Sequence, residues 1–93
     1  MDISIPIEFG VKWRGRYLRP SKHAIREMIL LGMDLHEVRA ILETGKDCAG
    51  TRSKGTIERQ VRDGRKVLKV VVVESYAHDI DELVWLVKHV GGK

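Results

Sequence analysis

Two short amphipathic helices in immediate succession are the feature that most constrains this chain. Ser21 has the side chain of a helix N-cap, because its hydroxyl can accept a hydrogen bond from a backbone N–H of the first turn. Apolar residues then recur at helical spacing through Met28 and Ile29. Gly32 can adopt the left-handed conformation that ends a helix. The segment therefore predicts one helix between Ser21 and Gly32.

A second helix is predicted to begin at once. Asp34 is a good N-cap, and Glu37 stands three residues later, as in a capping box. The apolar face continues to Leu42, and Gly45 follows as a terminator. Residues 21–44 are therefore expected to form two helices joined by a very short link.

Strands are predicted on both sides of these helices. Residues 3–9 alternate apolar and polar side chains, which is typical of a half-buried strand, and residues 11–13 could extend it. Pro6 lacks an N–H donor, so this strand is expected at a sheet edge or bulge. Arg14 to Arg16 is expected to form a turn, followed by a short extended piece at residues 17–19.

The second half of the chain is predicted to be rich in β-structure. Residues 46–55 contain Gly50, Ser53 and Gly55 and no periodicity, which predicts a loop. Residues 56–62 alternate, and Asp63-Gly64 predicts a hairpin turn. Residues 66–75 are apolar on both faces, which predicts a central strand covered on both sides.

Residues 79–90 fit two interpretations. Read as a helix, Asp79 caps it and Glu82 stands three residues on; read as a strand, apolar side chains alternate in two rows. In the strand interpretation Leu83, Trp85 and Val87 face one way. The β-branched and aromatic content favours the strand. The order strand, helix, helix and three strands predicts one α+β domain over residues 1–93, with the helical hairpin on an antiparallel sheet of three to four strands.

Length and composition exclude several classes. The chain has 93 residues, which is one small domain. Its apolar runs, such as Val70 to Val73, are far below the ~20 residues of a membrane span, so we expect no membrane partner. Cys48 is the single cysteine, so neither an internal disulfide nor a cysteine-rich zinc site can form, and a cytoplasmic location is expected.

Positive charge is concentrated in two segments. The net charge is +4, but residues 46–69 hold eight basic and three acidic side chains. A second basic cluster occupies residues 12–26. Such clusters suit a phosphate backbone, and the alternative is a merely solvated surface.

The start of the first helix resembles a known family. Ser21-Lys22-His23-Ala24, with Arg26, Met28, Gly32 and Val38 after it, resembles the opening of the DUF4258 family and, more distantly, the RelE/ParE-like toxins. The resemblance covers most of residues 16–90, so the first strand is an addition. It implies a helical pair on an antiparallel sheet and RNA cleavage or RNA binding. It also implies RNA or the ribosome and an antitoxin protein as partners.

Metal-independent RNA cleavage needs a base, an acid and a cation beside the phosphate. Arg59, Lys69 and His89 each interrupt an apolar strand face, and adjacent strands in register would bring them together. His23, in the first helical turn, is a further candidate for proton transfer. These four residues are the predicted catalytic set. The predicted RNA-binding residues are Arg26, Arg52, Lys54 and Arg62.

Each of these residues also has a structural interpretation. The strand residues could lie near strand ends with their charged groups in water, and His23 could pack against the sheet. The four histidines lack an HxxxH spacing, so no metal and no cofactor is expected. Trp13, Tyr17 and Trp85 could stack on bases or pack in the core. Without catalysis, the chain would be a nucleic-acid- or protein-binding module, and an exposed sheet edge could form a homodimer.

Overall fold

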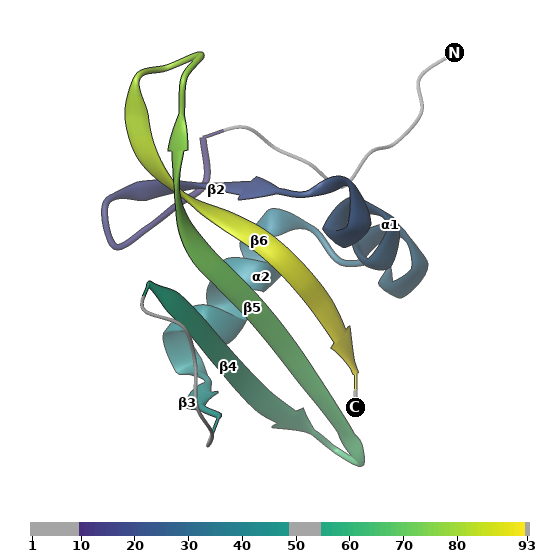
Figure 1. The fold of residues 1–93 in the computed structure, drawn as a ribbon. Coiled ribbons are helices and arrows are strands. Elements are labelled where there is room, and N and C mark those ends of the chain that lie inside the picture. The colour runs from purple at the N-terminus through teal and green to yellow at the C-terminus, as the bar shows by residue number, and fades with distance from the viewer. Residues whose placement is uncertain (1–9, 49–54, 93) are drawn as a thin grey trace.

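The computed structural model describes residues 10–48 and 55–92, which form two helices and six strands (Figure 1). The elements are β1 (Lys12–Trp13), β2 (Arg16–Pro20), α1 (Lys22–Leu31), α2 (Leu35–Thr44), β3 (Lys46–Asp47), β4 (Thr56–Asp63), β5 (Lys66–Ala77) and β6 (Glu82–Gly92). The predicted strand at residues 3–9 lies outside the described residues. No helix in the described ranges is both long enough and apolar enough to cross a membrane.

The six strands form one mixed sheet in the order β1-β2-β6-β5-β4-β3. The α+β class is as predicted, but a purely antiparallel sheet of three to four strands is wrong. β2 runs parallel to β6, and the other neighbouring strands pair antiparallel. Two of the strands, β1 and β3, have two residues each, so they are too short to show an alternating pattern in the sequence. For the same reason β3 falls within residues predicted as a loop.

Both helices form as predicted. The Ser21 hydroxyl accepts from the Ala24 N–H at 3.1 Å, and Gly32 has a φ of 65°. Asp34 and Glu37 form a capping box, with side-chain to backbone distances of 2.9 and 3.0 Å. The caps satisfy N–H groups that have no partner inside a helix, which explains why two ten-residue helices can follow one another so closely.

The helices pack on one face of the sheet and close the core (Figure 1). Met28, Leu35 and Leu42 are fully buried, as are Val70 and Val87 of the central strands. Side chains alternate along β5, so its odd-numbered valines lie on the other face, where they are only partly buried. We call that second face, away from the helices, the open face. The prediction that β5 is a central strand is confirmed, and the described helices cover it on one side.

β6 is a strand, as favoured, but its predicted alternation is wrong after Val87. Val72 pairs with Val87 while Val71 pairs with His89, so Lys88 is an additional residue, a β-bulge. The bulge puts Val87 and Val90 on the same, fully buried face although they are three residues apart. It also sends His89 to the open face.

The β4–β5 hairpin turns one residue later than predicted. Asp63 pairs with Lys66, so Gly64 and Arg65 form the two-residue turn. Gly64 has a φ of 65° at the first of these positions, which suits a type II′ hairpin. The eight residues of β4 all pair with β5, and β5, which has twelve residues, pairs on its other side with β6.

Candidate functional site

α1 lies along the part of the β6 edge that β2 does not reach (Figure 1). β2 pairs with β6 at Trp85, Leu86 and Val87. Beyond this point Glu27 of α1 takes over, and its Oε1 accepts a hydrogen bond from the Val90 N–H at 2.8 Å. A carboxylate thus satisfies an edge N–H of the strand, and Glu27 is fixed in position by the sheet itself.

The other oxygen of Glu27 joins two histidines. His23 Nε2 lies 3.2 Å from Glu27 Oε2, and His89 Nδ1 lies 2.8 Å from the same atom. The two imidazole rings are nearly parallel, at 17°, with centroids 6.2 Å apart. His23 and Glu27 are one helical turn apart on α1, and the bulge of β6 delivers His89. We call these three residues the His–Glu–His cluster.

The cluster is accessible from solvent. The side chains of His23 and His89 are 67% and 41% exposed, whereas Glu27 is 20% exposed. Each ring turns one nitrogen toward Glu27, which leaves His23 Nδ1 and His89 Nε2 for another partner. Gly91 stands close by, since a Cβ there would lie 3.2 Å from Cε1 and Nε2 of His89. The absence of a side chain at Gly91 gives the His89 ring its room.

Lys69 shares the open face with His89. Lys69 pairs with Gln60 and with Gly91, and the next open-face position of β5, Val71, pairs with His89. Lys69 Nζ contacts Glu58 Oε2 at 2.9 Å, and the Glu58 side chain is only 3% exposed. A nearly buried carboxylate therefore anchors this ammonium group on the open face.

Arg59 does not join these residues, so the expectation that Arg59, Lys69 and His89 converge is wrong. Arg59 pairs with Val70, which is fully buried, and so lies on the helix face. Its Nε contacts Asp47 at 2.9 Å, and its NH1 donates to the Leu42 carbonyl of α2 at 2.6 Å. Neighbouring positions of a strand point to opposite faces. Arg59 and Lys69 therefore lie on different faces although their strands are adjacent.

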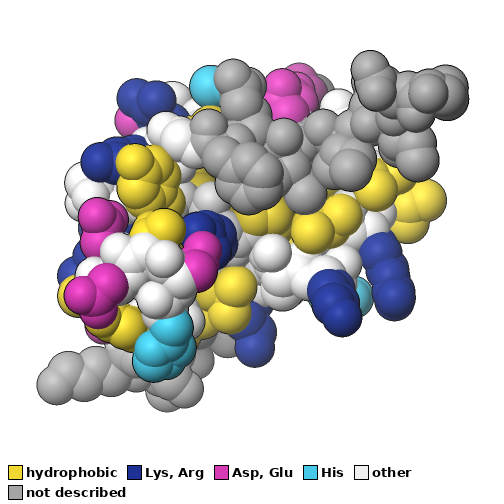
Figure 2. Space-filling view, turned by 90° about the horizontal axis from the view of Figure 1, so that it is seen from above, with side chains coloured by type: hydrophobic (Ala, Val, Ile, Leu, Met, Phe, Trp, Pro, Cys, Tyr) yellow, Lys and Arg dark blue, Asp and Glu magenta, His cyan; other side chains and the backbone are white. Residues whose placement is uncertain are grey.

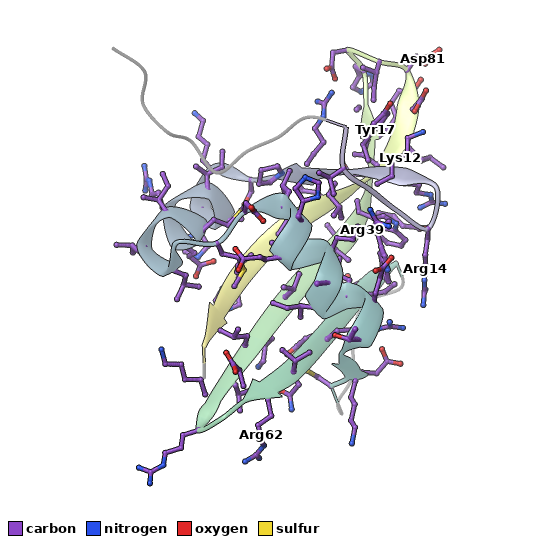
Figure 3. The ribbon with its side chains drawn as sticks, turned by 180° about the vertical axis from the view of Figure 1, so that it is seen from behind. Lys12, Arg14, Tyr17, Arg39, Arg62 and Asp81 are labelled. Carbon is purple, nitrogen blue, oxygen red and sulfur yellow. The ribbon has the colours of Figure 1, made fainter. Side chains whose placement is uncertain are left out.

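The predicted RNA-binding residues are found in different places. Arg26 is exposed on α1, three residues after His23 and therefore beside it on the helix surface. Arg62 is exposed near the β4–β5 turn, at the opposite end of the molecule from Lys12 and Tyr17 (Figure 3). Arg52 and Lys54 lie outside the described residues.

A hollow of about 490 Å³ opens beside β3 and β4. Lys46 and Arg62 line it together with Gln60, which pairs with Lys46 across the two strands. Gln60 and Lys69 are also directly opposite each other, so a polar row crosses the open face from β3 to β5. This row continues to Gly91, next to the His–Glu–His cluster.

Other charged side chains are compensated locally. Arg19 forms a two-point contact with Asp79 at 3.2 and 2.8 Å, and this hydrogen bonding lowers the pKa of Asp79 and raises that of Arg19. Arg16 likewise contacts Glu74 at 2.9 Å. Seen from above, basic side chains are interspersed with acidic and apolar ones (Figure 2). The surface seen in that view is therefore not uniformly positive or negative.

The tryptophans belong to the core rather than to an exposed stacking surface. Trp13 and Trp85 are 4% and 6% exposed, with ring centroids 5.5 Å apart. The Trp85 indole N–H donates to the Trp13 carbonyl at 3.1 Å. Their structural interpretation is confirmed, since buried faces cannot receive a base.

Glu27 is the residue that sequence reasoning missed. A pair of histidines at HxxxH spacing is the usual sign of a metal site on a helix, whereas α1 supplies a His and a Glu four residues apart. The spacing of His23 and Glu27 was visible in the sequence, but the approach of His89 depends on the bulge in β6. Comparisons with family models, with curated proteins and with solved structures found no match to this chain.

Proposed function

We propose that this protein binds RNA on the open face of its sheet and cleaves it, without a metal ion, at the His–Glu–His cluster. The observation that carries the proposal is the meeting of two predicted proton-transfer residues, His23 and His89, at one oxygen of Glu27. Of the four predicted catalytic residues, these two retain that role. Arg59 has a structural role instead, through its contacts with Asp47 and the Leu42 carbonyl.

In the proposed reaction, the 2′-hydroxyl oxygen attacks the adjacent phosphorus and the bond to the 5′-oxygen breaks. One imidazole accepts the proton of the 2′-hydroxyl, and the other donates a proton to the departing 5′-oxygen. The products are a 2′,3′-cyclic phosphate and a 5′-hydroxyl. The outer nitrogens, His89 Nε2 and His23 Nδ1, are the atoms assigned to these steps. Glu27 holds both rings in orientation, as a carboxylate does beside a catalytic histidine.

Cations near the cluster support binding of the substrate. Arg26 follows His23 on the helix surface, and exposed Lys88 precedes His89 at the bulge. Exposed Arg62 adds positive charge on the open face, where Lys69 also lies, paired with Glu58. A strand of RNA laid from the β4–β5 turn to α1 would meet these side chains in sequence. The ribosome as the site of action and an antitoxin as a covering partner remain part of this proposal.

The test is cleavage of a short RNA in EDTA by the full chain. We expect His23→Ala and His89→Ala each to reduce the rate by about 10²-fold or more, as loss of a general acid or base does. His78→Ala is the matched control, because His78 is exposed and stacks edge-on with Tyr76 away from the cluster. A substrate with a 2′-deoxy sugar at the cut should resist cleavage. Cleavage that survives both substitutions would contradict the proposal.

A second candidate function is RNA binding without cleavage, favoured by the hollow that Lys46 and Arg62 line. Binding to phosphates weakens as salt rises, because bound counterions are released. The double substitution Lys46→Ala with Arg62→Ala should remove two phosphate contacts. The slope of the logarithm of RNA affinity against the logarithm of salt concentration should then fall by about two. A wild-type chain that binds RNA with this slope and never cuts it would support the second function over the first.

A further inference from the structure

The His–Glu–His cluster has a composition that proton transfer alone does not require. Two imidazole nitrogens and one carboxylate oxygen, all within 4.8 Å of one another, converge from α1 and β6. This donor set is the one that Zn²⁺ and similar ions use in sites with an open coordination position. We propose that the cluster binds one divalent transition-metal ion of the zinc type, through His23 Nε2, Glu27 Oε2 and His89 Nδ1.

The distances suit such an ion. Bonds of about 2.0–2.2 Å in a tetrahedral arrangement separate neighbouring donor atoms by roughly 3.3 Å. The two contacts with Glu27 Oε2 measure 3.2 and 2.8 Å. The two imidazole nitrogens lie within 4.8 Å, and the exposed His23 side chain is able to rotate toward His89 to close that gap. The ion takes the place of the protons between the rings and Glu27, and each ring then carries its proton on the outer nitrogen.

The surroundings hold the ligands in place. Glu27 Oε1 accepts from the Val90 N–H at 2.8 Å, so its other oxygen is aimed at the histidines. Such outer contacts orient metal ligands and raise metal affinity. His89 lies on a strand in the middle of the sheet order, and His23 is in a capped helix, so both ligands come from rigid elements. Three protein ligands leave a coordination position open to solvent.

The chemistry of the donors also predicts selectivity. Mg²⁺ and Ca²⁺ prefer oxygen ligands, whereas imidazole suits Zn²⁺, Co²⁺ and Ni²⁺. The proposed site is independent of the proposed RNA cleavage, but it has a consequence for it. An ion bound to both rings replaces their hydrogen bonds to Glu27, and the rings then no longer take part in proton transfer. Zinc is therefore expected to inhibit the cleavage that EDTA permits.

The experiment titrates the full chain with Zn²⁺ by calorimetry and with Co²⁺ by its visible absorption, in the absence of RNA. We expect one ion per chain, with Mg²⁺ and Ca²⁺ failing to compete. His23→Ala, Glu27→Gln and His89→Ala should each weaken Zn²⁺ binding by about a hundredfold. His78→Ala should bind as the wild type does. Circular dichroism establishes that each variant is folded.

Two results would overturn the proposal. One is the absence of saturable binding by the wild-type chain. The other is weak binding that the three cluster substitutions leave unchanged, which would mark it as adventitious binding to surface histidines. Because no RNA is present, either failure leaves the proposed cleavage standing. Conversely, a metal site in a chain that never cleaves RNA would refute the proposed cleavage and leave the site established.

Discussion

Substitution of Arg59 by alanine should destabilise the fold without acting on the chemistry of the cluster. Arg59 NH1 donates to the Leu42 carbonyl, one of the last carbonyls of α2, which have no partner within the helix. A positive charge at the C-terminal end of a helix also interacts favourably with the negative end of the helix dipole. The side chain is 17% exposed, and its guanidinium lies 5.4 Å from the Trp13 ring centroid.

The expected loss can be assembled from these contacts. A hydrogen bond from a charged donor contributes roughly 1.5–3 kcal/mol, and the contact with Trp13 about 0.5–1 kcal/mol. Asp47 is 75% exposed, so its pair with Arg59 adds at most about 1 kcal/mol. Because such terms are not additive, Arg59→Ala should lower the free energy of unfolding by about 2–4 kcal/mol.

The assay is urea unfolding followed by the fluorescence of the two tryptophans, with the midpoint and slope fitted together. The melting temperature should fall by on the order of 10 °C or more, since about 1 kcal/mol shifts a domain of this size by ~4–8 °C. Asp47→Ala is the matched control and should cost under about 1 kcal/mol. The reasoning is refuted if Arg59→Ala unfolds like the wild type while RNA cleavage disappears.

Two further predictions concern a surface pair and the site. The contact with Arg19 lowers the pKa of Asp79, so its contribution to stability is present above the ordinary pKa of an aspartate, about 3.9, and is lost as pH falls through the lowered value. Unfolding curves from pH 7 to pH 2 should show this loss in the wild type and its absence in Asp79→Asn. Gly91→Ala should press on the His89 ring and reduce Zn²⁺ affinity about tenfold, with little change in stability. Calorimetry checks this result, and unchanged affinity would contradict it.

The helices and the main strands could be predicted because their signals are local. Ser21, Asp34 and Glu37 act on backbone groups three residues away, and each does so as expected. The ladder of β4 with β5 follows from the alternation along residues 56–62, the apolar run in residues 66–75 and the turn signal between them. The parallel pairing of β2 with β6 depends on the path of the whole chain, and no local pattern specifies it.

The candidate site was predicted in part for the same reason. His23 and His89 were both identified as single residues, but their meeting depends on the additional residue at Lys88. A strictly alternating β6 would not place Val87 and Val90 on one face. Arg59 was assigned to the wrong group because the register of β4 against β5, which separates it from Lys69, is a property of the pair of strands.

The most direct test of the central claim is a nitrogen NMR spectrum of the histidine side chains, recorded for the wild type and for Glu27→Gln without added metal. If one oxygen of Glu27 joins both rings, the substitution should shift the imidazole signals of His23 and His89 together and leave those of His78 in place. A shift confined to His23, its neighbour on α1, with His89 unchanged, would show that the cluster does not form.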